Sequence, residues 1–337
     1  MRSANVFGMH SLVTGGAGFI GSHLTEALLA RGDRVTVVDN LSTGRRENLA
    51  GAEKSDRLSF HEGSVFDEAL MRELSADADR IFHLAAAVGV MLIIERPVHT
   101  IETNIHGTET VLRCAADRGI PVLVASSSEV CGKGNGQPFK EEDDMILGPT
   151  CRSRWSYAAS KAVDEFLALA YHRERGTPAV VARYFNTIGP RQIGQYGMVV
   201  PRFVTQALDG GPITVFGDGT QSRAFAWVGD VVAGSIALTE SPAAHGQVFN
   251  LGCDEEITIQ GLAEKVRDLV NPEVEIIKVP YEEAYEQGFE DLGRRVPDLS
   301  RTRETVGYEP TIGLDETLSR IVAHLRSERS SPAGPGS

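Results

Sequence analysis

The chain has 337 residues but only four cysteines, and this scarcity excludes several classes of protein. None of the four belongs to a C-x-x-C pair, so we expect neither a zinc site nor a redox motif. Four cysteines in a chain of this length are also too few for a disulfide framework, which favours a reduced, cytoplasmic compartment. They are Cys114, Cys131, Cys151 and Cys253.

Positive charge is also scarce, since 33 Lys and Arg face 46 Asp and Glu and the formal net charge is −13. This balance argues against nucleic-acid binding and against docking on an anionic membrane. The longest apolar run, 84–94, is too short to span a membrane, which takes about 20 residues. No signal peptide is expected before the glycine-rich segment at Gly15. An anionic substrate is compatible with the net charge if arginines are placed locally to bind it.

What the first half does contain is an alternation of strand-like and helix-like segments. With 42 % hydrophobic residues, the chain can form a sizeable core. The alternation predicts an α/β fold, a doubly wound parallel sheet of the Rossmann type with helices on both faces. The strand-like segments are 10–14, 34–38, 58–61, 80–84, 121–125 and 179–183, and the helix-like segments are 19–31, 67–75, 97–117 and 157–175.

After Asn186 the alternation stops, and glycine and proline become frequent. We therefore expect a smaller C-terminal α/β domain, with one segment of the chain returning to the first domain. The predicted first domain is 1–186 plus 227–252, and the second is 187–226 plus 253–329. The composition of 330–337 predicts a disordered tail.

Residues 14–21 contain three glycines with G-x-x-G-x-x-G spacing, Gly15, Gly18 and Gly21, between a predicted strand and a predicted helix. Glycines at such a turn let the backbone approach a pyrophosphate, and the helix N-terminus supplies free N–H groups. Asp39 lies eighteen residues after Gly21, at the end of the second strand. A carboxylate there binds the ribose hydroxyls of NAD and repels the 2′-phosphate of NADP. The segment therefore predicts an NAD site.

Tyr157 and Lys161 lie four residues apart on a predicted helix and so share one face. A Lys ammonium beside a phenol lowers a pKa that is ordinarily about 10, which makes Tyr157 a candidate general base. Small polar residues followed by Glu129 end a predicted strand, where open parallel sheets bind ligands. A hydroxyl there can bridge a substrate alcohol to Tyr157, and Glu129 is a candidate second acid or base.

Together these motifs resemble the extended short-chain dehydrogenase/reductase family that acts on nucleotide sugars, over about residues 8–325. The resemblance implies a bound NAD that first oxidises a sugar carbon. It implies that Tyr157 takes the proton of the sugar 4-hydroxyl, that Ser127 bridges the two, and that Lys161 holds the nicotinamide ribose. The other cofactor-binding residues that it implies are Phe19, Ile20, Asn40, Ser42, Thr43, Gly44, Ser64, Val65, Leu84, Ala85, Ala86, Asn104 and Tyr184.

Within this family, the run 127–130 is similar to the Thr-Ser-Glu-Val of UDP-glucuronic acid decarboxylases. The 4,6-dehydratases of the dTDP-glucose type carry Asp-Glu at Ser128 and Glu129, and Ser128 is too weak an acid for their reaction. GDP-mannose 4,6-dehydratases share Thr-Ser-Glu, so the match is not unique. A UDP-sugar 4-epimerase is the second reading and a 4,6-dehydratase the third. A protein that binds NAD without catalysis would not need the intact Ser127, Tyr157 and Lys161.

Two arginine segments are also similar to the decarboxylases, Gly-Pro-Arg ending at Arg191 and Arg-Arg-Val-Pro-Asp around Arg295. The resemblance implies that Arg223 binds the substrate phosphates and that Arg191 or Arg295 lies near the sugar carboxylate. Glu129 or Arg295 is the candidate acid that protonates C5. UDP is preferred over TDP by resemblance alone. The remaining implied substrate residues are Asn186, Val200 and Phe216.

The sequence departs from the family at three positions. Cys131 stands where Tyr is usual and is expected to pack, and Ser64 and Val65 replace the usual pair at the adenine. The basic segment 149–155 either contacts substrate or lies on the surface. The resemblance further implies a homodimer, in which two helices of each chain form a four-helix bundle. The apolar stripes of those helices are Ile101, Ile105, Leu112 and Ala115, and Val163, Phe166, Leu167 and Ala170.

Overall fold

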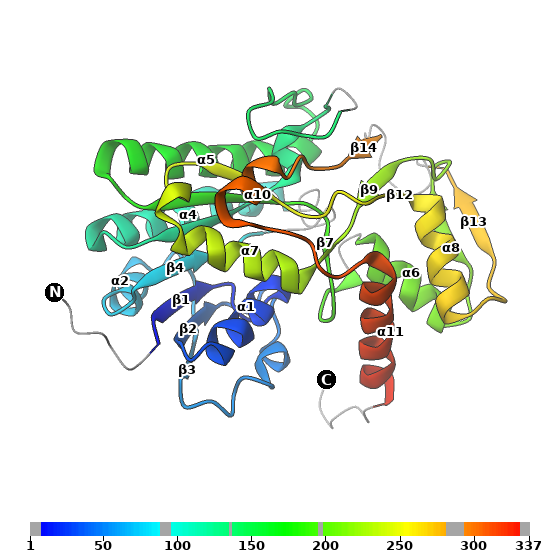
Figure 1. The fold of residues 1–337 in the computed structure, drawn as a ribbon, viewed down its shortest axis with the longest axis horizontal. Coiled ribbons are helices and arrows are strands. Elements are labelled where there is room, and N and C mark those ends of the chain that lie inside the picture. Colours follow the sequence, from blue (N-terminus) through cyan, green and yellow to red (C-terminus); the bar gives the residue numbers. More distant parts are fainter. Residues whose placement is uncertain (1–7, 88–95, 135–136, 195–197, 281–292, 331–337) are drawn as a thin grey trace.

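The computed structural model describes residues 8–87, 96–134, 137–194, 198–280 and 293–330. Its centre is a seven-stranded parallel sheet in the order β11-β6-β5-β4-β1-β2-β3 (Figure 1). The strand order reverses between β1 and β4, the point at which doubly wound sheets bind ligands. The predicted Rossmann-type fold is thus confirmed. The strands are β1 (His10–Thr14), β2 (Arg34–Asp39), β3 (Leu58–Glu62), β4 (Arg80–His83), β5 (Val122–Ser127), β6 (Ala179–Tyr184) and β11 (Val248–Leu251).

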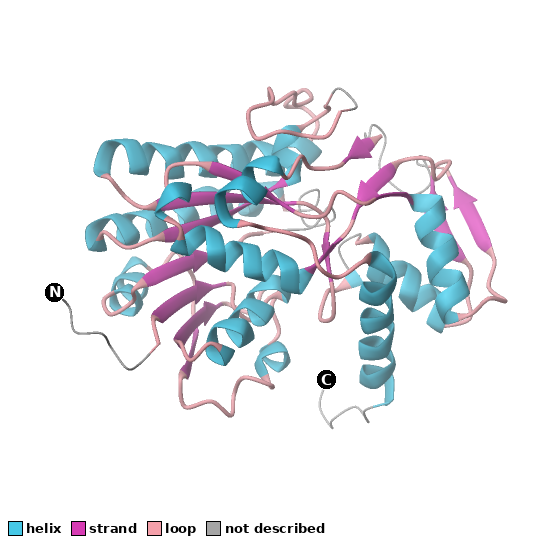
Figure 2. Cartoon of the chain, viewed as in Figure 1, coloured by secondary structure: helices cyan, strands magenta, loops and turns pink. Residues whose placement is uncertain are grey.

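Helices cover both faces of this sheet (Figure 2). Successive strand residues point to opposite faces, so Leu12 packs in the core under α2, α4 and α5, and Val13 packs in the core under α1 and α7. The helix α5 begins three residues before the predicted start, because the buried Trp155 anchors its first turn. The helices are α1 (Phe19–Ala30), α2 (Glu68–Ser75), α4 (Pro97–Arg118), α5 (Arg154–Arg175) and α7 (Val228–Glu240), with the 3₁₀ turns η1 (Arg46–Leu49), η2 (Ser128–Cys131) and η4 (Pro242–Ala244).

The residues after Asn186 build a second core around Phe203, Val215 and Leu262. In this part β9 is the central strand of a three-stranded sheet, β12-β9-β14, while β8 pairs with β13 and β7 pairs with β10. The elements are β7 (Thr187–Ile188), α6 (Val199–Leu208), β8 (Ile213–Phe216), β9 (Ser222–Ala224), β10 (Ala226–Trp227), β12 (Glu256–Thr258), α8 (Ile259–Val270), β13 (Ile276–Val279), β14 (Arg294–Arg295), α10 (Ser300–Val306) and α11 (Leu314–Ser330).

Two segments return from this second part to the large sheet. The segment 227–252 supplies α7 and β11, and β11 pairs with β6. The helix α10 also packs against β11 and α7, and its neighbours Leu299 and Tyr308 join the core beneath α1 and α7. The tail predicted at 330–337 lies outside the described residues, apart from Ser330 at the end of α11.

Candidate active site

A cavity of about 570 Å³ extends along the carboxyl ends of the central strands. The loops after β1, β2, β4, β5 and β6 line it on one side, and segments of the second part line it on the other. All the predicted site residues line this cavity except Gly44 and Asn104. Gly44 packs against Asp39, since a Cβ on it would lie 2.9 Å from both carboxylate oxygens. Asn104 is fully buried and binds Ala87 N and Ser160 Oγ, both at 3.0 Å.

The glycine-rich turn after β1 has the form that a pyrophosphate needs. Gly15 has a φ of 70°, in the left-handed region that favours glycine. A Cβ on Gly21 would collide with the carbonyl oxygen of Gly15, so this glycine lets α1 pack closely on the turn. Among the described residues, no side chain caps the N-terminus of α1. Its first N–H groups and the positive end of its dipole therefore face the cavity beside Gly18.

Asp39 lies at the end of β2, where its carboxylate is held by two backbone N–H groups. Ala17 donates to Oδ2 at 2.9 Å and Leu41 donates to Oδ1 at 2.8 Å. Burial raises the pKa of Asp39, and these backbone hydrogen bonds oppose that rise. Each carboxylate oxygen can accept a second hydrogen bond. The turn and Asp39 thus fit the pyrophosphate and the ribose of a dinucleotide.

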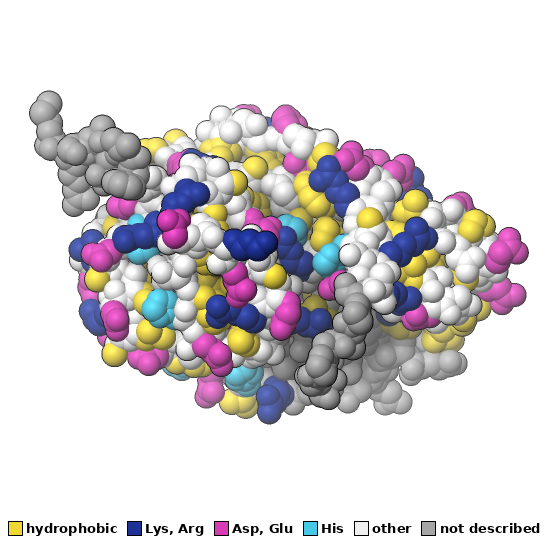
Figure 3. Space-filling view, turned by 90° about the horizontal axis from the view of Figure 1, so that it is seen from below, with side chains coloured by type: hydrophobic (Ala, Val, Ile, Leu, Met, Phe, Trp, Pro, Cys, Tyr) yellow, Lys and Arg dark blue, Asp and Glu magenta, His cyan; other side chains and the backbone are white. Residues whose placement is uncertain are grey.

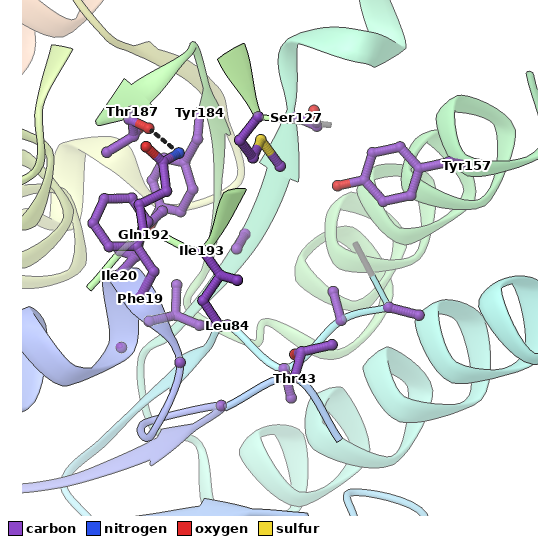
Figure 4. A pocket seen from close by; sticks show the side chains of 18 of the residues that line it. Phe19, Ile20, Thr43, Leu84, Ser127, Tyr157, Tyr184, Thr187, Gln192 and Ile193 are labelled. Carbon is purple, nitrogen blue, oxygen red and sulfur yellow. Dashed lines mark hydrogen bonds between the residues drawn. The ribbon is translucent and has the colours of Figure 1, made fainter. Parts of the chain in front are cut away.

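Tyr157 extends from α5 with its hydroxyl pointing into the cavity, near Ser127 at the end of β5 (Figure 4). Burial raises the pKa of Tyr157, a hydrogen bond with Ser127 lowers it, and the carboxylates of Glu129 and Asp164 raise it further. The net effect is a pKa above its usual value. The expectation that Lys161 lowers this pKa stays a prediction, and Lys161 is itself paired with a carboxylate.

That carboxylate belongs to Asp164, which the sequence analysis did not single out. Lys161 Nζ lies 2.7 Å from Asp164 Oδ2, and both side chains are buried. The two residues are three positions apart on α5, so a helical periodicity could have placed them side by side. No motif marks Asp164, however, and spacing alone does not show that it faces inward.

Glu129 lies at the centre of a group of arginines from three distant segments. Arg295 donates to its Oε1, and Arg154 lies 3.3 Å from its Oε2. The pairing of β14 with β9 places Arg295 beside Arg223. Burial alone would raise the pKa of Glu129, but the charges of Arg295, Arg154 and Arg223 outweigh it and hold the pKa below its usual value. Glu129 is therefore a carboxylate at neutral pH.

Three cavity arginines lie outside the predicted set, Arg96, Arg154 and Arg202. Arg154, from the basic segment before Tyr157, lines the cavity and does not simply lie on the surface. Arg202 of α6 lines it too, donating to the carbonyl of Thr214 at 2.9 Å and stacking on the Phe216 ring at 4.1 Å. A lone arginine on an apolar helix gives no signal in the sequence that it faces a cavity.

Arg191 lines the cavity, but its guanidinium is engaged on the cofactor side. It lies 2.5 Å from Glu26 Oε2 of α1 and donates to the carbonyl of Asn48 in η1 at 3.0 Å. Asn48 in turn donates to the carbonyl of Ala17 in the glycine-rich turn at 2.8 Å. Arg191 also has a φ of 70°, which is unusual for a residue other than glycine. These bonds place its guanidinium beside α1 rather than beside Glu129.

Cys131 is buried next to Val130, Phe139 and Phe185. Burial raises the pKa of its thiol to about 12, and the nearby Arg183 only partly opposes this. A thiol in this state is a poor nucleophile. The geometry thus gives Cys131 a packing role.

A parallel sheet with a glycine-rich turn after β1, and with Ser127, Tyr157 and Lys161 around one cavity, defines an NAD-dependent dehydrogenase/reductase type of fold. The chain belongs to the NAD dependent epimerase/dehydratase family, whose model matches residues 11–252. In the described part of the chain, no helix is both long and apolar enough to cross a membrane.

Three relatives illustrate the similarity. UDP-N-acetyl-alpha-D-glucosaminuronate decarboxylase of Bacillus cytotoxicus is 40 % identical over 94 % of this chain and 97 % of its own length. UDP-glucuronic acid decarboxylase 1 of Arabidopsis thaliana is 39 % identical over 94 % of this chain and 69 % of its own length. The crystal structure of the dTDP-glucose 4,6-dehydratase of Streptomyces venezuelae with NAD bound is 32 % identical, with a TM-score of 0.84, and the match covers 95 % of this chain and 98 % of that one.

Proposed function

We propose that this protein is an NAD-dependent decarboxylase of a UDP-linked hexuronate, with UDP-glucuronate as the substrate. The observation that carries the proposal is the group of arginines around Glu129, next to Ser127 and Tyr157. Three guanidinium groups beside the catalytic hydroxyls suit a substrate that carries both a diphosphate and a sugar carboxylate. The decarboxylase relatives, similar over nearly the whole chain, support the same reaction.

In the proposed reaction, the cofactor half would hold NAD through Gly15, Gly18, Phe19, Ile20 and Asp39. When bound, NAD would supply the oxidant for C4 of the sugar. Tyr157 takes the proton of the 4-hydroxyl, and Ser127 hydrogen-bonds to the same oxygen. The resulting ketone lies β to the C6 carboxylate. The C5–C6 bond then breaks, CO₂ leaves, and the electron pair moves into the carbonyl as an enolate. Ser127 and Tyr157 stabilise the negative charge on that oxygen.

The charge state of Glu129 bears on the proton that C5 must then receive. Because the arginines keep Glu129 ionised at neutral pH, it enters the reaction as a carboxylate and not as the acid. This leaves Arg295, or a water held between Arg295 and Glu129, as the proton source. Arg223, nearly buried in the central strand of its sheet, is assigned to the substrate phosphates. We assign binding of the sugar carboxylate to Arg295 rather than to Arg191.

Incubation of UDP-glucuronate with the protein and NAD, with the product identified by proton NMR, tests this function. UDP-xylose or its 4-keto form would establish decarboxylation, and the ratio of the two would show whether the hydride is returned. UDP-galacturonate would instead identify a 4-epimerase. If the compound is unchanged, the 2-acetamido counterpart should be tried, and its decarboxylation would move the assignment to that substrate.

We also propose a homodimer through α4 and α5. These helices pack on each other and expose apolar side chains, with Val98 66 % and Phe166 62 % accessible and Ile101 and Val163 also exposed. Exposed apolar residues on adjoining helices suit a partner with the same surface. Phe166→Glu should convert a dimer to a monomer in light scattering, whereas Leu269→Glu, at an exposed position on α8, should not. A monomeric wild-type protein would contradict the proposal.

A further inference from the structure

Asp164 is a buried carboxylate that the proposed reaction does not use. It lies on α5, three residues after Lys161, and its side chain has 0 % accessibility. Its Oδ2 accepts a hydrogen bond from Lys161 Nζ at 2.7 Å. A carboxylate and an ammonium this deeply buried are tolerated only when they are paired. The lysine of the Tyr157–Lys161 pair is therefore held and partly neutralised by a third residue on the same helix.

The other ionisable groups nearby do not share this task. His83 of β4 contacts Thr14 Oγ1 at 2.8 Å and Thr108 Oγ1 at 3.1 Å. Burial and the charge of Lys161 lower the pKa of His83 to about 3, so it is neutral. Glu165, the next residue after Asp164, is engaged by Arg183 at 2.7 Å and by Ser126 at 2.6 Å.

On the other side of the tyrosine, the charged groups are Glu129 of η2 and Arg295 of β14, which are paired with each other. Arg154 of α5 and Arg223 of β9 also act on Glu129. At the phenol, Glu129 raises the pKa of Tyr157 more than Arg295 lowers it, so Glu129 acts in the same direction as Asp164. Asp164 differs from Glu129 in its partner, which is the Lys161 ammonium, the group expected to favour the phenolate.

We propose that Asp164 is a positioning residue that fixes the Lys161 ammonium and offsets its charge, and thereby sets the pH at which Tyr157 becomes a base. An unpaired ammonium at this position would favour the phenolate, whereas a carboxylate disfavours it. The burial of Tyr157 and the charge of Asp164 both raise its pKa. With Asp164 present, Tyr157 therefore loses its proton at a higher pH than it would beside Lys161 alone. This inference rests on the proposed function, in which Tyr157 is the base.

Asp164→Asn tests the proposal, because it keeps the shape of the side chain and removes its charge. The measurement is the rate of NADH formation in a single turnover of UDP-glucuronate, followed as a function of pH. In Asp164→Asn, the rising limb of this pH–rate profile should lie about one pH unit lower than in the wild type. Asp164→Glu keeps the charge and should retain a profile close to that of the wild type. An unchanged limb in Asp164→Asn, or a shift to higher pH, would overturn the proposal.

A second readout does not depend on the substrate. Ultraviolet difference titration of tyrosinate, with Tyr157→Phe as the reference protein, should show the Tyr157 phenol ionising at lower pH in Asp164→Asn. If UDP-glucuronate is not turned over at all, the proposed function fails, while this titration still decides the role of Asp164. If Asp164→Asn does not fold, Asp164→Ser removes the same charge with a smaller side chain.

Asp33→Asn is a matched control. Asp33 is buried and lies 2.5 Å from the buried Arg80, at the opposite end of the sheet from the site. Its substitution also removes a carboxylate from a buried cation, which keeps one contact with Glu240 at 2.5 Å, so it should lower stability as Asp164→Asn does. It should leave the pH profile and the tyrosine titration unchanged. A shift in both variants would mean that the profile reports stability and would overturn the assignment to Asp164.

Discussion

The two halves of the cavity are built from different kinds of group. The cofactor half is lined by the glycine-rich turn, by apolar side chains such as Phe19 and Leu84, and by the carboxylate of Asp39. The substrate half is lined by four arginines from four separate elements, Arg154, Arg202, Arg223 and Arg295, with Glu129 among them. A dinucleotide can thus be bound by backbone N–H groups and a helix end, whereas a sugar nucleotide with a diphosphate and a carboxylate calls for positive side chains.

This difference explains how a chain with a net charge of −13 can serve an anionic substrate. On the face shown in Figure 3, acidic and basic side chains are interspersed, with no broad region of one sign. The positive charge that matters is gathered inside the cavity, where Arg223 is nearly buried. Partly buried charges are screened less by salt than exposed ones. We therefore expect substrate binding to depend on these arginines and not on the net charge.

The largest expected effect comes from Tyr157, which lies where the two halves meet. Tyr157→Phe should lower turnover about a thousandfold, because it removes the general base, and should leave NAD affinity nearly unchanged. Rapid-quench rates and NAD titration calorimetry measure the two quantities. Tyr171→Phe, on the same helix but outside the cavity lining, is the control. If NAD binding falls together with turnover, the two halves are not separable.

Arg295→Gln should act on the substrate half alone. It removes one partner of the partly buried Glu129, and we expect turnover to fall about a hundredfold with NAD affinity unchanged. Equal losses of NAD affinity and turnover would contradict the separation of the cofactor half from the substrate half. Arg295→Lys keeps the charge and should recover part of the rate.

The same variant has a pH signature in stability. In the folded wild type the pKa of Glu129 is held below its value in the unfolded chain. The ionised carboxylate therefore stabilises the fold at pH values above the unfolded pKa. This contribution is lost as the pH falls through the lowered pKa of the folded state. Arg295→Gln should therefore lose about 1–3 kcal/mol of unfolding free energy at neutral pH. The difference from the wild type should shrink in acid. Urea unfolding at pH 7 and pH 4 measures both values.

Asp39→Asn should act on the cofactor half alone. It keeps the shape of the side chain but can accept only one of the two backbone hydrogen bonds, and it removes the charge, so NAD affinity should fall about tenfold. Discrimination against NADP should fall as well, because the repulsion of a 2′-phosphate is lost. Fluorescence titration with each cofactor measures this, and UDP affinity serves as the internal control. A loss of UDP affinity would show that Asp39 also organises the substrate half.

The same division separates what could be predicted from the sequence from what could not. The glycine-rich turn, Asp39 and the Tyr157–Lys161 pair lie within short contiguous segments whose spacing fixes their geometry. The substrate half joins distant segments, since Arg295 of β14 contacts Glu129, which lies 166 residues earlier, and β14 also pairs with β9. No spacing rule brings Glu129 and Arg295 together, and their assignment needed a resemblance to a family.

Ionisation states were the least predictable property. The effect of Lys161 on Tyr157 follows from the sequence only if nothing else lies nearby, and the fold places Asp164 and Glu129 there. Similarly, Gly44 and Asn104 belong to matched segments, but they support the cavity from outside its lining. A motif identifies which residues are near a site and not which of their atoms face it.

The smallest expected effect decides to which half Arg191 belongs. Its partly exposed ion pair with Glu26 ties the segment after β7 to α1, so Glu26→Gln should speed NAD dissociation about threefold and leave the KM for UDP-glucuronate unchanged. Arg191→Gly removes the guanidinium and adopts the φ of 70° without strain, so it should have the same effect in a stably folded protein. Stopped-flow release of NAD measures the rate, and Lys265→Gln, which breaks an exposed pair with Asp315, is the control. A raised KM with unchanged NAD release would instead return Arg191 to the sugar carboxylate, where the sequence first placed it.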